Sequence, residues 1–266
     1  MKLQVKERWV KVLRQNLYVH LDGISNSVLT KGIGHQDFDR YTIHRPKNLL
    51  LLDPSEESGD YEAHTGFRII RGQENVDRYL SNLNYETRRE IKWLDFEDYD
   101  ALKRLTANEI AEILYLSHMK MQLRSPFFYK LQNDYAFFET QQEIMKVYYR
   151  NIDEFYQTLA QKISHKVLYQ LNANRSLFSK RYNSILPLET DTIKELKSIM
   201  QEGTVFEFSQ VGLKDGEYHI PVHVVEDNLR KIESDRLFLE EKVGVLTYRH
   251  RDKIWEFKRV ENAILY

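Results

Sequence analysis

Residues 204–225 read TVFEFSQVGLKDGEYHIPVHVV, and this stretch decides the fold class. Apolar and polar residues alternate on both sides of Asp215-Gly216, a pair that supplies the positive backbone angles of a two-residue hairpin turn. The pattern therefore predicts two antiparallel strands. In that register one face carries the apolar side chains of the core, namely Val205, Val211, Leu213, Tyr218, Ile220, Val222 and Val224.

Helices and further hairpins flank this stretch. Thr106, with Glu109 three residues later, predicts a capped helix start, and apolar residues at every fourth position predict a long amphipathic helix over 151–171. A helix over 191–200 precedes the stretch, and a polar helix over 227–241 follows it. Hairpins are predicted over 135–149 and 243–260. Helices segregated from antiparallel hairpins are typical of the α+β class rather than of a wound parallel sheet.

The remaining segments place the domain boundary. Residues 76–83 carry a helical apolar stripe, and Ile91 with Leu94 suggests a second short helix. Residues 172–189 show no periodicity and contain Pro187, which predicts a linker. We therefore expect a mixed, largely helical N-terminal region over 1–174 and an α+β C-terminal region with two hairpins over 185–266.

Composition excludes several classes of protein. The chain has no cysteine, which excludes disulfide frameworks, cysteine-ligated zinc, iron–sulfur clusters and cysteine nucleophiles. A formal net charge of −1 excludes a global electrostatic attraction to nucleic acid or anionic lipid, although a local patch stays open. No strictly apolar run exceeds four residues. We therefore expect no membrane span and, because the N-terminus lacks a signal-like apolar block, a cytoplasmic location.

One candidate metal site lies near the N-terminus. His35, Asp37 and Asp39 occupy alternate positions, and in an extended conformation they would point the same way, roughly 7 Å apart. An imidazole with carboxylates suits a divalent ion, which in a metal-dependent hydrolase lowers the pKa of a bound water. The alternative is an ordinary polar loop, because the spacing matches no specific metalloenzyme.

His219 and His223 form a second pair, whose interpretation depends on secondary structure. A spacing of four would place both imidazoles on one metal in a helix, but Pro221 and the alternating flanks predict a strand. On a strand the rings lie roughly 13 Å apart and cannot share an ion. The same register places His223 opposite Phe208. A half-covered sheet face is the main interpretation, and a ligand-facing or partner-facing surface is the alternative.

The terminal hairpin is the candidate nucleic-acid site. Residues 248–259 hold five cations against two acids, interleaved with the rings of Tyr248, Trp255 and Phe257. Rings that stack on bases beside cations that contact phosphates suit a single-stranded nucleic acid. The alternative is that Trp255 and Phe257 pack inward and leave an ordinary solvated surface. The candidate binding residues are Arg249, Arg251, Lys253, Lys258 and Arg259.

Aromatic residues concentrate between Phe127 and Tyr156, where ten of thirty residues are Phe or Tyr. Tyrosine joins an apolar ring to a polar hydroxyl, which suits surfaces that are buried only on association. Across the whole chain tyrosine outnumbers phenylalanine, 17 to 13, and this surplus favours a homo-oligomer interface in this region, with a plain aromatic core as the alternative.

Enzyme signatures of fixed spacing are absent from the sequence. It contains no P-loop, His-Glu-x-x-His, Gly-x-Ser-x-Gly or kinase set, and Gly32-Ile33-Gly34 lacks the third glycine of a dinucleotide fingerprint. No cofactor and no catalytic residue follow from these patterns. A site assembled from residues far apart in the sequence stays open, because such sites are recognised by geometry.

Two stretches resemble a known group of proteins. They are residues 105–133, which include LTANEI, SHMK and SPFFYKLQN, and residues 218–225, YHIPVHVV. These stretches are similar to a group of uncharacterised cytosolic proteins of lactic-acid bacteria. The resemblance implies a bacterial cytosolic protein and transfers no activity or functional residue.

Binding, most simply self-association through a tyrosine-rich surface, is the leading functional hypothesis, because the aromatic excess is accompanied by no enzyme signature. The alternatives are single-stranded nucleic-acid binding through the terminal hairpin and metal-dependent hydrolysis at His35, Asp37 and Asp39.

Overall fold

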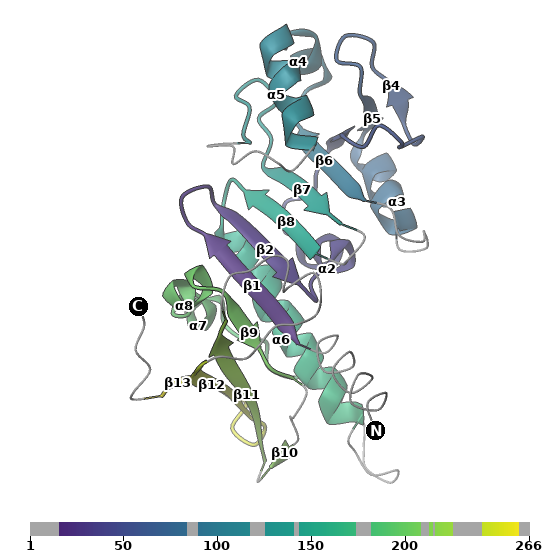
Figure 1. Ribbon diagram of the computed structural model, residues 1–266. Coiled ribbons are helices and arrows are strands. Elements are labelled where there is room, and N and C mark those ends of the chain that lie inside the picture. Colours follow the sequence, from purple (N-terminus) through teal and green to yellow (C-terminus); the bar gives the residue numbers. More distant parts are fainter. Residues whose placement is uncertain are drawn as a thin grey trace, which may run out of the picture. The chain divides into compact units, whose positions relative to one another are not determined.

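The computed structural model describes residues 16–83, 90–117, 126–140, 144–173, 182–208, 213–214, 216–225 and 241–260, and Figure 1 labels their helices and strands. They fall into two compact units. The central unit contains Asp22–Leu29 and Ile33–Phe155, and the C-terminal unit contains Thr30–Gly32, the residues up to Leu21 and those from Tyr156 onward. Helices and antiparallel strands occur in both, so the α+β class is confirmed. No helix in the described ranges is long and apolar enough to cross a membrane.

The central unit is built on an antiparallel sheet with the strand order β8-β7-β6-β3-β5-β4. The bounds are β3 Asn48–Leu51, β4 Asp60–Tyr61, β5 Arg68–Arg71, β6 Ile91–Phe96, β7 Tyr135–Glu139 and β8 Ile144–Tyr149. Strand β2 (Ser27–Lys31) is divided between the two units.

The register of this sheet explains why its strands are apolar almost throughout. One row of residues lies opposite one another on successive strands and faces one side, namely Leu50, Leu94, Ala136 and Tyr148. The next row faces the other side and consists of Leu51, Trp93, Phe137 and Val147. Both rows are buried. A sheet covered on both faces gives continuous apolar runs instead of alternation.

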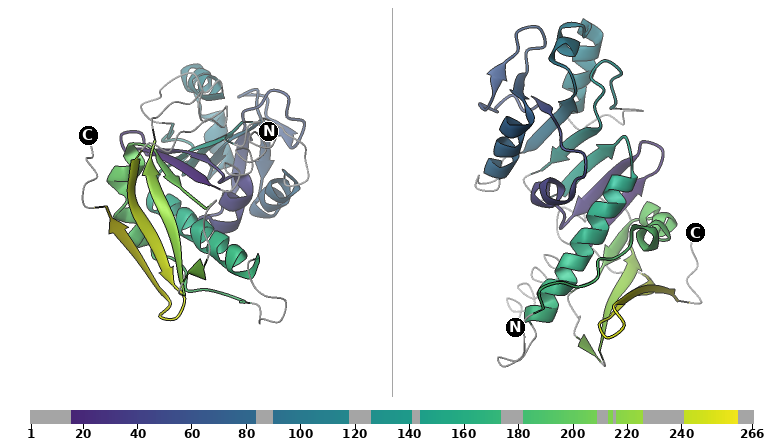
Figure 2. Two further views of the ribbon diagram at one scale, coloured as in Figure 1. Left: turned by 60° about the horizontal axis from the view of Figure 1, so that its bottom comes forward. Right: turned by 180° about the vertical axis from the view of Figure 1, so that it is seen from behind.

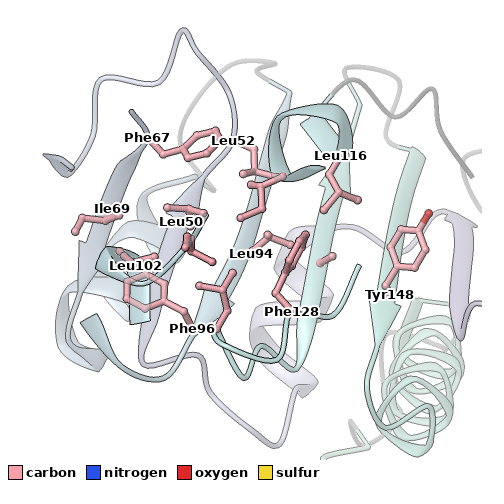
Figure 3. Packing of buried hydrophobic residues seen from close by; sticks show 14 of the residues in the cluster. Leu50, Leu52, Phe67, Ile69, Leu94, Phe96, Leu102, Leu116, Phe128 and Tyr148 are labelled. Atoms are coloured by element: carbon pink, nitrogen blue, oxygen red, sulfur yellow. The ribbon is translucent and has the colours of Figure 1, made fainter. Parts of the chain in front are cut away.

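Helices α4 (Tyr99–Lys103) and α5 (Ala107–Ser117) cover the first face. They contribute Leu102, Ile113 and Leu116 to the cluster around Leu94, which Figure 3 shows from close by. The predicted capping box at the start of α5 is present, because the backbone N–H of Thr106 donates to the Glu109 carboxylate at 2.7 Å and the backbone N–H of Glu109 donates to the Thr106 hydroxyl at 3.3 Å. Each fully buried leucine here stabilises the fold by roughly 1.5–3 kcal/mol.

Helix α2 (His35–Tyr41) packs on the second face through Phe38, which is 1% exposed. The Phe38 ring lies 5.5 Å from Trp93 and 5.1 Å from Tyr135 in edge-to-face contacts, and Trp93 stacks on Phe137 at 4.9 Å. Helix α3 (Gln73–Leu83) also belongs to this unit and buries Val76, Leu80 and Leu83.

In the C-terminal unit the strand order is β13-β12-β11-β9-β1, and β10 pairs with β11 (Figure 2). The bounds are β1 Leu17–Asp22, β9 Thr204–Phe206, β10 Leu213–Lys214, β11 Glu217–Val224, β12 Glu241–Arg249 and β13 Ile254–Arg259. Helix α6 (Asp153–Ala173) begins in the central unit and continues into this one, where Leu159, Ile163 and Val167 are fully buried. Helices α7 (Thr190–Lys194) and α8 (Lys197–Gln201) follow.

Most predicted elements are present. The helices predicted over 76–83, after Thr106 and over 151–171 are α3, α5 and α6, and the hairpins predicted over 135–149 and 243–260 are β7–β8 and β12–β13. The helix predicted over 191–200 is divided into α7 and α8. The polar helix predicted over 227–241 lies outside the described residues, apart from Glu241, which begins β12.

Two predictions for the central unit are wrong. Ile91 and Leu94 belong to strand β6, because a spacing of three also fits a strand that is buried on both faces. Residues His35 to Asp39 are helical instead of extended. The Asp37 carboxylate accepts the backbone N–H of Gly34 at 3.2 Å, and this contact and the burial of Phe38 favour the helix.

The predicted strand pairing around Asp215-Gly216 is partly wrong. Leu213 lies opposite Tyr218, as the hairpin register requires, but His223 lies opposite Val205 and not Phe208. Val205 is therefore on the His223 side of the sheet. Strand β9 is buried on both faces, so its apolar pattern could not distinguish the two registers.

The division into units differs from the boundary expected between 174 and 185. Strand β1 and most of α6 group with the C-terminal elements, because β1 pairs with β9.

Candidate functional site

A groove of about 690 Å³ lies beside α3 in the central unit. We call it the α3 groove; its lining residues are Ser58–Asp60, Ile69–Gly72, Asn75, Arg78, Tyr79 and Asn82. Ile70 supplies an apolar surface, and guanidinium, carboxamide and phenol groups surround it, whereas the side chain of the neighbouring Ile69 belongs to the cluster around Leu94. A concave site with an apolar surface and a few convergent polar groups is the usual form of a small-molecule site.

Helix α3 positions the polar groups of the α3 groove. Arg78 and Tyr79 are three and four positions after Asn75 and four and three positions before Asn82, so the four residues lie along one side of the helix. The helix begins after Gly72, whose φ of +82° is a conformation that glycine adopts readily. The Asn48 side chain accepts the Gly72 backbone N–H at 3.0 Å and so fixes the start of α3 against β3.

The two arginines of the α3 groove are held by surface ion pairs. Arg71 is 3.0 Å from Asp60, with side chains 51% and 69% exposed, and Arg78 is 3.3 Å from Glu74, with side chains 65% and 90% exposed. The Arg71 guanidinium also lies over the Tyr99 ring, 4.9 Å from its centroid. Exposed pairs of this kind contribute about 0–1 kcal/mol, so an incoming anion can replace the carboxylates at little cost.

Gly59 lines the α3 groove, and Glu56 holds another lining residue, Tyr79. A Cβ on Gly59 would stand 2.3 Å from the Ile69 carbonyl oxygen, so only glycine fits beside β5. The Tyr79 hydroxyl donates to Glu56 at 3.1 Å. Burial alone would raise the pKa of the Glu56 carboxyl, but hydrogen bonds from Ser58 and Tyr79 lower it below its ordinary value. Glu56 therefore stays ionised and holds the Tyr79 ring in place.

The residues predicted to bind a metal do not come together around a common point. His35 Nδ1 is 2.8 Å from the Glu139 carboxylate, the Asp37 carboxylate caps the Gly34 backbone N–H, and Asp39 is paired with Arg45. Within the described residues, no group of three or more His, Cys, Asp or Glu side chains could hold a metal ion. The extended conformation on which that hypothesis depended is replaced by α2.

The terminal hairpin keeps cations on its surface but buries two of its rings. Tyr248 is 1% exposed and Trp255 is 9% exposed, and the Trp255 ring N–H donates to the Leu186 carbonyl at 2.8 Å. The predicted residues Arg251, Lys253, Lys258 and Arg259 are exposed, and Arg249 is 3.4 Å from Glu256. Lys258 is also 3.4 Å from Glu256. The hairpin therefore keeps cations at its surface, whereas the buried Tyr248 and Trp255 rings are not available to bases.

His219 and His223 both lie on strand β11 and have separate partners, as the strand interpretation predicts. His219 Nδ1 is 3.1 Å from the Thr247 hydroxyl, and His223 Nε2 is 3.2 Å from the Glu207 carboxylate. Burial lowers the pKa of His223, although Glu207 opposes this effect.

The aromatic concentration from Phe127 to Tyr156 is mainly core. Tyr129 is 91% exposed and Phe127 is partly buried, but the other eight rings are buried, namely Phe128, Tyr135, Phe137, Phe138, Tyr148, Tyr149, Phe155 and Tyr156. The alternative interpretation as an aromatic core therefore accounts for these residues.

Sequence reasoning did not identify the α3 groove. The only signal for it is the polar side of α3 opposite Val76 and Leu80, and such a side is most often simply solvated. Comparison with known proteins adds no assignment, because no family model, curated protein or solved structure matches the chain.

Proposed function

We propose that the chain is a binding protein whose ligand is a small polar molecule with a carboxylate or phosphate group, held in the α3 groove. The observation that supports this function is the presence of two guanidinium groups, Arg71 and Arg78, on the lining of a groove of about 690 Å³. Arginine presents a planar fork of donors that matches carboxylate and phosphate oxygens.

The remaining lining suits the uncharged part of such a ligand. Asn75 and Asn82 offer both donors and acceptors, and Ile70 offers apolar contact. The ligand's anionic group would replace Asp60 and Glu74 as the partner of the guanidiniums, which breaks only exposed ion pairs.

Isothermal titration calorimetry and amide NMR shifts of the full chain test this function. The probes are inorganic phosphate, citrate and adenosine monophosphate. We expect at least one probe to shift the amides of Gly59 and Gly72, and Arg71→Ala or Arg78→Ala to weaken its binding roughly tenfold, about 1.4 kcal/mol. Arg104→Ala is the matched control, because Arg104 is a surface arginine outside the groove, 3.8 Å from Asp98. Equal binding by the groove variants and the control would contradict the proposal.

Three further expectations stay predictions. Self-association now depends on exposed rings such as Tyr129 and not on the buried ones, and nucleic-acid binding depends on the hairpin cations alone. A bacterial, cytoplasmic setting is part of the proposal as well. Light scattering at micromolar concentration tests the first, and binding to a labelled single strand at two salt concentrations tests the second.

A further inference from the structure

His44 is an exposed imidazole that buried groups hold in place. Its side chain is 64% exposed, and its Nδ1 lies 2.8 Å from Oε1 of Glu154, whose side chain is only 5% exposed. The other oxygen of that carboxylate accepts a hydrogen bond from the Tyr135 hydroxyl. The same hydroxyl lies 3.1 Å from the His44 carbonyl oxygen. The segment after α2, the first turn of α6 and the start of β7 thus meet at one point.

These contacts determine which nitrogen of His44 can accept a proton. An ionised carboxylate only accepts hydrogen bonds, so Nδ1 donates to Glu154 and Nε2 carries the lone pair. Among the residues that the structure describes, none is hydrogen bonded to Nε2. Nε2 is therefore a base that faces solvent, and the hydrogen bond from Nδ1 to Glu154 fixes the orientation of the ring. A fixed orientation makes proton transfer efficient.

The charged and titratable groups around His44 keep it suited to this role. Glu154 faces it from α6, Tyr135 and Asp134 face it from the start of β7, and its neighbour Arg45 is paired with Asp39 of α2. The hydrogen bond and charge of Glu154 raise the pKa of His44, and Asp134 adds to this effect. Burial, and then Glu154, raise the pKa of Tyr135, so its hydroxyl remains a donor.

The carboxyl of Asp95, beside Tyr135, titrates near neutral pH. Asp95 accepts the backbone N–H groups of Asp134 and Tyr135 at 3.0 and 2.7 Å. Burial raises its pKa to about 7, against the opposing effect of these hydrogen bonds. Titratable groups with displaced pKa values are more frequent at catalytic sites than elsewhere.

We propose that His44 is the general base of a site that hydrolyses carboxylic esters, with Glu154 and Tyr135 as positioning residues. Nε2 takes a proton from a water molecule while the water oxygen attacks the ester carbonyl carbon. The tetrahedral intermediate then breaks its bond to the alkoxy oxygen, and the proton on Nε2 passes to that leaving group. The products are a carboxylic acid and an alcohol, and the imidazole is neutral again. None of these residues lines the α3 groove, so this inference is independent of the proposed ligand.

The test follows cleavage of 4-nitrophenyl acetate by the full chain between pH 5 and 9, beside free imidazole at the same concentration. We expect the chain to exceed free imidazole and His44→Gln to lose the excess, about 10²-fold or more. Glu154→Gln keeps the size of the side chain and removes its charge. We expect it to lower the rate about tenfold and to move the midpoint of the pH–rate profile to lower pH, because the imidazole loses its anionic partner.

His219→Asn is the matched control, because His219 is also an exposed imidazole beside a carboxylate, Glu217, at 3.4 Å. We expect this variant to keep the parent rate, and circular dichroism to show that each variant is folded. His44 is exposed, so His44→Gln remains informative even where Glu154→Gln fails to fold. A parent rate no higher than that of free imidazole, or equal losses in His44→Gln and His219→Asn, would overturn the proposal. An unchanged midpoint in folded Glu154→Gln would overturn the positioning role.

Discussion

His44 with Glu154 in the central unit, and His223 with Glu207 in the C-terminal unit, are both imidazole–carboxylate contacts, at 2.8 and 3.2 Å. Both carboxylates are buried, with side chains 5% and 7% exposed. The imidazoles differ, because His44 is 64% exposed and His223 is 13% exposed. The pKa of His44 is raised by its hydrogen bond to Glu154, whereas the pKa of His223 is lowered by burial.

The comparison teaches that a carboxylate partner alone does not determine how a histidine titrates. Desolvation penalises the charged imidazolium, and at His223 this penalty is larger than the attraction to Glu207. At His44 the imidazole stays in water and only the carboxylate is buried, so the attraction prevails. The pair in the C-terminal unit therefore keeps a neutral imidazole buried, and the pair in the central unit exposes a basic imidazole to solvent.

The largest expected effect comes from removing the group that holds the central carboxylate. Tyr135→Phe deletes the hydroxyl that donates to Glu154 and leaves a buried carboxylate with one donor fewer. We expect the free energy of unfolding to fall by about 1–3 kcal/mol, measured by urea denaturation. Tyr61→Phe is the control, because Tyr61 is 65% exposed, and it should change stability by less than about 0.5 kcal/mol. Equal losses of stability in the two variants would show that the Tyr135 hydroxyl does not stabilise the buried Glu154 carboxylate.

The next effect is the opposite pH dependence of the two pairs. The raised pKa of His44 means that its contribution to stability is complete below the ordinary imidazole pKa and is lost as pH rises through the raised value. The lowered pKa of His223 means that its contribution is complete above the ordinary pKa and is lost as pH falls through the lowered value.

Proton NMR titration of the two imidazoles, with His44→Gln and His223→Gln for assignment, measures these directions. We expect His223→Gln to lower the free energy of unfolding by about 1 kcal/mol above pH 7. His44→Gln should lower it by less, because water screens an exposed contact. Displacement of both pKa values in the same direction would show that burial and not pairing governs both sites.

A smaller effect is expected from salt. Raising sodium chloride from 0.05 to 0.5 M shortens the screening length from roughly 14 to 4 Å. The upward displacement of the His44 pKa should shrink, because its ring is exposed, whereas the His223 pKa should change less. The same NMR titration at the two salt concentrations checks this, and an equal response of both rings would contradict it.

The smallest effect is expected at the exposed pair of His219 and Glu217, whose side chains are 45% and 40% exposed. Glu217→Gln should change the free energy of unfolding by less than about 0.5 kcal/mol, because water already solvates both groups. Thermal denaturation at pH 6 measures it. A loss of stability as large as that of Tyr135→Phe would mean that the contribution of these contacts does not depend on how exposed they are.

Much of the fold could be predicted because its signals are local. The capping box at Thr106 and Glu109, the fourfold apolar repeat of α6 and the tight turn before Glu217 each depend on neighbouring residues. The failures occurred where burial on two faces removes alternation, as in β6 and β9, and where the insertion of one ring, Phe38, into an aromatic cluster favours a helix.

The sites could not be predicted in the same way. His44 and Glu154 are 110 positions apart, and Tyr135 lies 91 positions from His44, so no spacing connects them. The metal hypothesis used three residues at alternate positions, His35, Asp37 and Asp39, and each of them has a different partner in the fold. A sequence shows only which residues are close along the chain, whereas the contacts among His44, Glu154 and Tyr135 depend on how the strands pair.

Two of the three tryptophans of the chain provide one optical label for each unit. Trp93, fully buried and stacked on Phe137, belongs to the central unit, and Trp255, beside Tyr248 at 4.9 Å between ring centroids, belongs to the C-terminal unit. The third tryptophan, Trp9, lies outside the described residues. Replacing Trp9 and one of the other two with phenylalanine leaves the remaining tryptophan to report, by emission wavelength and quenching, on whether its unit loosens first under heat or denaturant. The chain thus carries a built-in means of following its two halves separately without any attached dye.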